Sequence, residues 1–382
     1  MKEKKPDSEM QHLLDAVRKL IIGILTLLVI LILTLTFFMN QKGLQKWIES
    51  VQPQSRTIIS KEKEGKGTES FNDLRSNALN YFEPIPSIDP ALSDALVQLG
   101  KELYNDTRLS KKGNISCNSC HNLTTYGVDN LPTSPGDNGK LGARNSPSSF
   151  YAALHRVQFW DGRAKDVEEQ AGMPILNPIE HNIPSKQYLI NRLKRVPEYQ
   201  EKFKSAFPAD ANPITYTNIT NAIGAFERTL LPESRFDLWL KGEDRALTEQ
   251  EKKGLSTFIE TGCISCHSGV VLGGQQLQKF GLYGDYWEFT KSQTVDRGVL
   301  EVSQLASDKY VFKVPSLRNI EMTYPYFHDG SVDSLDEAIR IMAKLQTNST
   351  LEDVQVEAIK AFLSSLTAGL TAVENRGMKQ QR

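Results

Sequence analysis

All four cysteines of this 382-residue chain fall in two copies of one short pattern, Cys-x-x-Cys-His. The first copy, residues 117–121, reads CNSCH, and the second, residues 263–267, reads CISCH. No cysteine is left over for any other purpose. Any fold of this chain must therefore bring two thiols and one imidazole together at each of two separate points.

Four kinds of chemistry use thiols at this spacing. The pattern is the attachment signature of c-type haem, in which the two thiols form thioethers with the porphyrin and the adjacent imidazole binds the iron. The alternatives are two disulfides, a thioredoxin-like redox pair, or a zinc site built from the four thiols and two histidines. Two copies, each followed at once by His, favour haem over these alternatives. We predict two covalently bound c-type haems, the first held by Cys117, Cys120 and His121, the second by Cys263, Cys266 and His267.

An uncharged apolar run covers residues 20–41. It is long enough to cross a bilayer core, which needs about 20 apolar residues. A cleaved signal peptide would have a shorter apolar stretch followed by small residues, and a soluble core helix would show a polar stripe. We therefore predict one retained transmembrane helix. More basic residues precede the run than follow it, which predicts that residues 1–19 are cytoplasmic. The haem-bearing part would then be anchored at the inner membrane and lie in the bacterial periplasm, the side on which c-type haem is attached.

The rest of the chain is expected to be mostly α-helical. Residues 42–80 are polar with little periodicity, which predicts a flexible linker. An amphipathic helix signal precedes each haem motif, the first over residues 90–104 and the second opened by Thr248 and Glu251 as a capping box. Strand signals are sparse. This layout predicts two tandem cytochrome c-like domains, residues 81–235 and 236–370, followed by a polar tail, residues 371–382.

The charge balance excludes one class of partner. The chain has 45 basic and 46 acidic residues and a formal net charge of -1, with both signs scattered along it. A nucleic-acid partner would need a basic face to neutralise phosphates. We therefore expect no binding to nucleic acid.

Between residues 91 and 366 the chain resembles the bacterial di-haem cytochrome c peroxidases. Besides the haem motifs, the resemblance is carried by residues 103–110 (LYNDTRLS), 144–147 (RNSP), 158–164 (QFWDGRA), 224–229 (GAFERT), 314–319 (VPSLRN) and 324–330 (YPYFHDG). The resemblance implies that the N-terminal haem reacts with hydrogen peroxide. It implies that the C-terminal haem, of higher potential, accepts electrons from a donor cytochrome c or a copper protein. Members of this family are often homodimers.

The resemblance also implies roles for individual residues. Glu180 matches the acid-base group beside the peroxidatic haem, Gln170 the amide that orients peroxide, and Trp160 the aromatic residue between the haems. Judged by residue type alone, Glu and Gln side chains are usually solvated, and a buried Trp is often a packing residue. His328 could be a structural histidine or part of a link to the second haem.

Met342 matches the sixth ligand of the electron-accepting haem, where a neutral thioether raises the potential. It shares one face of a predicted helix with Ala338 and Ile339, and Ser334 and Glu337 form the capping box expected to open that helix. An ordinary core methionine is the alternative. The related enzymes that oxidise tryptophans of a partner protein carry Tyr at this position, so Met342 favours a peroxidase over that activity.

A calcium ion at the domain interface is also implied by the resemblance. The side chain of Asn145 and the backbone carbonyls of Thr323 and Pro325 match its ligands. Oxygen ligands of this kind suit a hard cation.

One departure from the family concerns the loop after residues 131–133 (LPT). Many members have a histidine there that blocks the peroxidatic iron, but residues 137–139 read DNG. This absence predicts an iron that is five-coordinate or water-bound when fully oxidised, unless His155 or His181 replaces the missing ligand. A membrane-tethered electron relay without peroxide turnover is the remaining alternative, and Glu180 and Gln170 argue against it.

Overall fold

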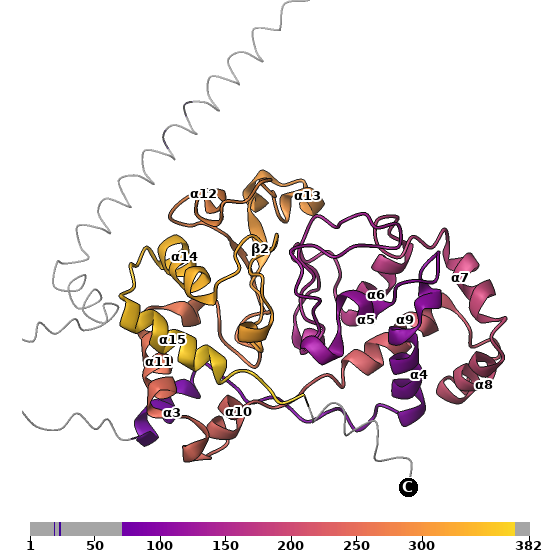
Figure 1. Ribbon diagram of the computed structural model, residues 1–382, viewed down its shortest axis with the longest axis horizontal. Coiled ribbons are helices and arrows are strands. Elements are labelled where there is room, and N and C mark those ends of the chain that lie inside the picture. Colours follow the sequence, from indigo (N-terminus) through magenta and orange to yellow (C-terminus); the bar gives the residue numbers. More distant parts are fainter. Residues whose placement is uncertain (1–18, 20–22, 24–70, 371–382) are drawn as a thin grey trace, which may run out of the picture. The chain divides into compact units, whose positions relative to one another are not determined.

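The computed structural model describes Lys19, Gly23 and residues 71–370 (Figure 1). Nearly all of the predicted span, residues 20–41, therefore lies outside the described residues, as do residues 42–70 of the predicted linker and the tail from 371 to 382. Within the part that is described, no helix combines the length and apolar character needed to cross a membrane. Residues 71–370 all belong to one compact unit, which begins at Thr68.

The first half of this unit is helical, as expected. Ser93 caps the helix before the first haem motif by accepting a hydrogen bond from Leu96 N, so that helix begins four residues later than the predicted start. The α-helices of this half are α4 (Asp94–Asn105), α5 (Cys117–Cys120), α6 (Val167–Leu176), α7 (Lys186–Leu193), α8 (Pro197–Ala206) and α9 (Tyr216–Glu227). Three short 3₁₀ turns join them: η1 (Thr107–Leu109), η2 (Leu123–Thr125) and η3 (Ala152–Leu154).

The second half is also mostly helical and contains one small antiparallel sheet. The capping box of Thr248 and Glu251 is present at the start of α11. The α-helices are α10 (Arg235–Leu240), α11 (Glu249–Glu260), α12 (Tyr286–Thr290), α13 (Leu300–Ser303), α14 (Leu335–Thr347) and α15 (Asp353–Ser364). The 3₁₀ turns are η4 (Asp244–Ala246), η5 (Cys263–Ser265), η6 (Ala306–Asp308) and η7 (Ile320–Met322). Strands β1 (Leu277–Lys279) and β2 (Val311–Lys313) pair with Gln278 opposite Phe312.

Both halves contain the same helix crossing. A Cβ atom on Gly100 of α4 would lie 1.8 Å from the carbonyl oxygen of Ala222 on α9, and a Cβ on Gly254 of α11 would lie 1.8 Å from that of Ala358 on α15. Only glycine lets the two backbones approach so closely. Because a Cys-x-x-Cys-His motif follows the first helix of each pair, the repeat seen in the sequence is also a repeat in the packing.

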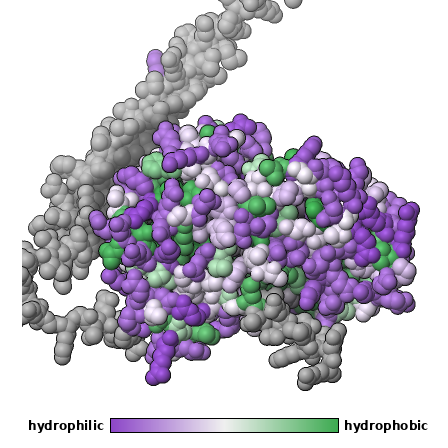
Figure 2. All heavy atoms as spheres, viewed as in Figure 1, coloured by the Kyte–Doolittle hydropathy of each residue, from purple (hydrophilic) through white to green (hydrophobic). Residues whose placement is uncertain are grey.

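Two hydrophobic clusters fill the interior. One is built from residues between Ile85 and Leu231 together with Val271, and the other from residues between Phe236 and Leu366 together with Ala78 and Phe82. Both clusters lie in one compact unit, so the division into two domains stays a prediction. Hydrophilic residues cover most of the face shown in Figure 2, with apolar residues scattered among them.

The end of the predicted linker, residues 71–80, lies within the described part of the chain and contains a helix. Residues Phe71–Ala78 form helix α3, and Ala78 is fully buried in the second cluster. Leu74 and Ala78, four positions apart, lie on one face of this helix, and both contact the second cluster, as does Phe82 just after the helix. This part of the chain therefore packs against the second half instead of forming a flexible linker.

Candidate functional site

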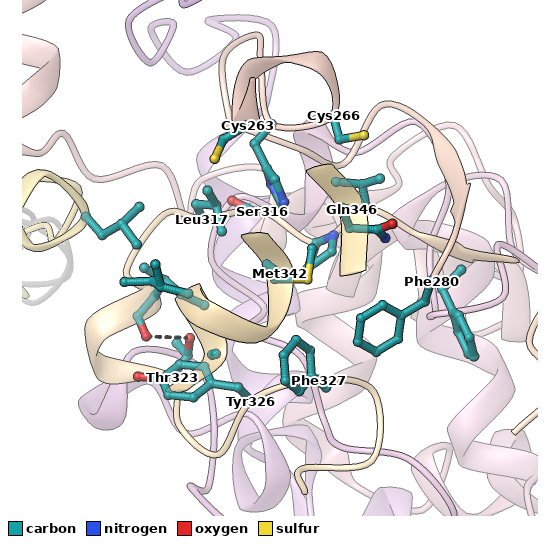
Figure 3. Close-up of a pocket in the computed structure, with 18 of the residues that line it drawn as sticks. Cys263, Cys266, Phe280, Ser316, Leu317, Thr323, Tyr326, Phe327, Met342 and Gln346 are labelled. Atoms are coloured by element: carbon teal, nitrogen blue, oxygen red, sulfur yellow. Dashed lines mark hydrogen bonds between the residues drawn. The ribbon is translucent and has the colours of Figure 1, made fainter. Parts of the chain in front are cut away.

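The second haem motif opens onto a cavity of about 320 Å³. Cys263, Cys266, His267 and Met342 all line it, and Figure 3 shows Met342 and Gln346 projecting from α14 into the space below the two cysteines. Much of the remaining lining is apolar, including Phe280, Leu282, Phe312, Leu335 and Ile339. Such a lining suits a large, flat, apolar group such as a porphyrin.

Each motif histidine is held in the form that can bind iron. Nδ1 of His267 lies 3.0 Å from the carbonyl oxygen of Leu272, and Nδ1 of His121 lies 2.9 Å from that of Pro147. A carbonyl can only accept, so Nδ1 carries the proton and Nε2 keeps a lone pair for a metal. Burial lowers the pKa of both imidazoles, which favours this neutral form. The residues present therefore fit c-type haem.

The four thiols do not support the alternative uses. All four cysteines are free in the structure, so neither pair forms a disulfide there. Among the described residues no group of three or more His, Cys, Asp or Glu side chains is arranged to hold a metal ion, which removes the zinc site. Burial raises the pKa of the Cys117 thiol strongly and that of Cys120 to about 11, whereas a thioredoxin-like pair needs a depressed thiol pKa.

Glu180 lies beside the first motif. Its negative charge raises the pKa of both the Cys117 and the Cys120 thiol, so the carboxylate is within electrostatic reach of both attachment residues. Asn177 Nδ2 donates to Glu180 Oε1 over 2.6 Å. Burial raises the pKa of Glu180, against the opposing effects of this hydrogen bond and the positive charge of Arg163. A carboxyl group held in one orientation with a raised pKa is suited to general acid-base chemistry.

Gln170 lies half-buried on α6, the helix that leads into the Glu180 segment. Asp166 caps α6 by accepting from Glu169 N over 2.8 Å. The backbone turn from Asn177 to Asn182 then carries Glu180, with Glu180 N donating to Asn177 O. The two side chains implied by the family resemblance thus come from one continuous helix and turn.

The loop that lacks the family's blocking histidine is packed against the Glu180 turn. The backbone N–H of Asp137 donates to the carbonyl oxygen of Glu180 over 2.8 Å. A Cβ on Gly136 would lie 1.8 Å from the carbonyl oxygen of Ile179, so only glycine fits there. The buried Asp137 carboxylate accepts from Lys112 N over 2.7 Å. This loop therefore supports Glu180 and carries no imidazole.

The two unassigned histidines lie in different places. His155 lines the cavity of the second motif. His181 is buried next to Glu180, with Nδ1 3.1 Å from the carbonyl oxygen of Leu109. Burial lowers the pKa of His181 to about 4, and the charge of His121 contributes to the shift. Of the two, His181 is therefore the one near the first motif.

Trp160 connects the two halves. Its Nε1 donates to the carbonyl oxygen of Asn145 over 2.9 Å, and its own carbonyl accepts from Lys313 N of β2 over 2.7 Å. The Trp160 ring meets His328 edge-on at 6.3 Å between centroids, and His328 stacks on Phe312 at 4.3 Å. All these rings line the cavity of the second motif, so Trp160 lies where the two halves of the unit meet.

The residues matched to calcium ligands lie along the same cavity: Asn145, Thr323 and Pro325. Asn145 Nδ2 donates to the carbonyl oxygen of Leu131 over 3.0 Å, which leaves its Oδ1 available as a ligand. The side chain of Asn130 donates to the carbonyl oxygens of Met322 and Tyr324, the residues on either side of Thr323. These amide and carbonyl oxygens are of the type a calcium ion uses.

Two clusters of charged residues at the junction were not found by sequence reasoning. Arg144 binds Asp161 of its own half over 2.5 Å and Asp296 of the other half over 2.6 Å. Lys313 of β2 binds His155 over 3.0 Å. The partners in each pair that joins the two halves are more than 150 positions apart in the sequence, so no local pattern could pair them.

The chain is similar to known proteins over most of its length. The family model described as di-haem cytochrome c peroxidase matches residues 94–245. The chain is similar to the cytochrome c551 peroxidase of Pseudomonas aeruginosa, at 44% identity over 79% of this chain and 88% of that protein. It is similar to the cytochrome c551 peroxidase of Nitrosomonas europaea, at 43% identity over 75% of this chain and 84% of that protein. A crystal structure of a MauG-like protein associated with microbial copper homeostasis superposes with a TM-score of 0.66, at 29% identity over 75% of this chain and 93% of that one.

Proposed function

Because the chain belongs to the bacterial di-haem cytochrome c peroxidase family, we propose that it reduces hydrogen peroxide to water with electrons from a small donor protein. The observation that carries this proposal is the half-buried Glu180 carboxyl group, held by Asn177 beside the thiols of the first motif. An electron relay would have no use for such a group at that place. The enzyme is thus an oxidoreductase acting on peroxide, and the donor is a cytochrome c or a copper protein.

A haem held by Cys117, Cys120 and His121 would supply the redox-active iron at which the peroxide O–O bond breaks. Glu180 then moves the proton: its carboxylate takes a proton from one peroxide oxygen and returns it to the oxygen that leaves as water. The hydrogen bond from Asn177 fixes the orientation of the carboxylate throughout. The Gln170 amide orients the peroxide. Two electrons and two protons convert one hydrogen peroxide to two waters.

The second site suits electron entry. His267 offers a ring nitrogen and Met342 a thioether to one largely apolar cavity, and such a ligand pair would give a haem iron a high potential. Trp160 lies at the junction toward the first half, where it assists the passage of electrons. The Met at position 342, in place of Tyr, favours peroxide reduction over oxidation of a partner protein.

We further propose that the first haem accepts peroxide without prior reduction of the second. The support is the loop at Asp137, which carries no histidine and is tied to the Glu180 turn by the Asp137 N–H. Electron paramagnetic resonance of the fully oxidised protein is expected to show high-spin iron at the first site. A spectrum with low-spin haem alone would contradict this, and His181 would then be the residue to substitute.

Four further features of the protein remain proposals. The segment 20–41 would anchor it in the inner membrane, supported by its lack of charge, and the haem-bearing part would work in the periplasm. A calcium ion would bind Asn145 together with the carbonyl oxygens of Thr323 and Pro325. A homodimer is the fourth, supported by the family alone.

The test is peroxide-dependent oxidation of a reduced cytochrome c, and separately of a reduced copper protein, by the chain carrying two haems. Multiple turnovers are expected with at least one donor. If haem content is two per chain and neither donor is oxidised, the proposed function is wrong and an electron relay takes its place.

A further inference from the structure

A buried lysine and a histidine face the cavity of the second motif. Lys313, on β2, is only 4% exposed, and its Nζ lies 3.0 Å from Nδ1 of His155. Both residues line the cavity together with Cys266 and Met342. Gly274 makes room for the imidazole, because a Cβ there would lie 2.6 Å from Cδ2 of His155.

The hydrogen bond between them determines where the protons are. A lysine ammonium can only donate, so Nδ1 of His155 accepts and its Nε2 carries the ring proton. Nε2 is buried and has no hydrogen-bond partner within the described part of the chain. A buried donor without an acceptor destabilises the fold, because it has lost its hydrogen bond to water. The His155 imidazole therefore presents one unsatisfied N–H donor at the edge of the cavity.

The ammonium group lacks a bonded counter-ion as well. The negative charge of Asp161 raises the pKa of Lys313, against the larger effect of burial. The Asp161 carboxylate is already paired with Arg144 at 2.5 Å and with Arg163 at 2.9 Å. Within residues 71–370 no carboxylate makes an ion pair with Lys313. Burial lowers the pKa of Lys313 to about 8, as expected for a cation without a partner. Buried charges are normally paired, so the ammonium group of Lys313 is suited to an anionic partner beyond those in residues 71–370.

We propose that Lys313 and His155 bind a propionate carboxylate of the haem held at the second motif. The two residues offer one positive charge and one N–H donor, which is the complement of a carboxylate. Haem propionates are the carboxylates that a c-type haem brings into a cavity whose other walls are largely apolar. This inference rests on the attachment of that haem, as the proposed function does.

The pair has a consequence for the electron-accepting site. A positive charge beside a propionate offsets its negative charge and so favours the reduced iron. Because Lys313 N also donates to the carbonyl of Trp160 over 2.7 Å, the strand that carries this charge is joined to the junction between the halves. Lys313 is thus a positioning residue that acts on the haem potential.

The experiment compares the haem-loaded chain with Lys313→Met, which removes the charge, Lys313→Arg, which keeps it, and His155→Phe, which removes the N–H donor. Resonance Raman spectra report the propionate bending mode, and a redox titration reports the potential of each haem. Lys313→Met is expected to shift the propionate band. At a fixed solution potential it should also lower the ratio of reduced to oxidised second haem by about tenfold, which is the size of effect expected from one partly buried charge. Lys313→Arg should preserve that ratio, and His155→Phe should shift the band with a smaller change in the ratio.

An unchanged propionate band in all three variants, or an effect confined to the first haem, would overturn the proposal. If Lys313→Met does not incorporate haem, the propionate bands of His155→Phe and Lys313→Arg decide whether the two residues bind the propionate. Peroxide turnover is measured on the same samples. Absence of turnover by the unmodified haem-loaded chain, with the expected spectra and potentials, would count against the proposed function alone, because binding of the propionate does not depend on peroxide chemistry.

Discussion

Substituting Glu180 by Gln removes the proposed proton carrier while keeping its shape. Asn177 Nδ2 donates to Oε1 of Glu180 at 2.6 Å, and the amide oxygen of Gln can accept the same bond. The substitution therefore deletes the acid-base function and little else. General acid-base catalysis contributes about 10²- to 10⁴-fold, which corresponds to roughly 3–5 kcal/mol of transition-state stabilisation. We expect kcat/KM for peroxide to fall by that factor in single-turnover mixing experiments.

The pH dependence adds an independent check. The carboxylate form of Glu180 must be present to take the proton, and burial holds its folded-state pKa above the ordinary value of 4.5. Activity of the wild-type chain should therefore fall as the pH decreases through this raised pKa. The amide introduced by Glu180→Gln cannot titrate, so this limb should be absent from the residual activity of the variant.

Stability separates a catalytic role from a structural one. A carboxyl group with a raised folded-state pKa destabilises the fold above that pKa, and the penalty disappears when it is protonated. Glu180→Gln should therefore have a Tm equal to or above that of the wild type at pH 7. Glu169→Gln is the matched control, because Glu169 is an exposed acid on α6, the helix that leads into the Glu180 turn. The activity of this variant should stay within about twofold of the wild type. Full activity of Glu180→Gln with two haems bound would refute the reasoning.

Three other substitutions test the fold and the second site. Gly254→Ala places a Cβ 1.8 Å from the carbonyl oxygen of Ala358. Although Ala is the better helix former, this clash should lower the free energy of unfolding, measured with denaturant, by about 3 kcal/mol or more. Unchanged stability would contradict the close crossing of α11 and α15. Arg318→Met leaves the fully buried Asp237 carboxylate without its 2.5 Å partner and should cost about 3–5 kcal/mol; a loss below about 1 kcal/mol would show that the pair contributes little. Met342→Tyr should lower the potential of the second haem in a redox titration, and an unchanged potential would mean that another residue is the sixth ligand.

Several features could be predicted from the sequence because they depend on residues close together in the chain. The two Cys-x-x-Cys-His motifs place the thiols and the proximal imidazole of each site within five positions of the sequence. The helix before each motif follows from apolar periodicity and from caps such as Thr248 with Glu251. The mostly helical fold follows in turn.

Tertiary structure decided what depends on contacts between distant residues. The polar composition of residues 71–80 predicted a linker, but burial of Ala78 and Phe82 against the second half makes it a packed helix. The raised pKa of Glu180 arises from its burial, which no single residue in its own segment reveals. The pairing of Lys313 with His155 joins positions 158 apart in the chain. Local spacing determined what each haem site is made of, whereas burial and long-range packing determined the electrostatic surroundings in which those groups work.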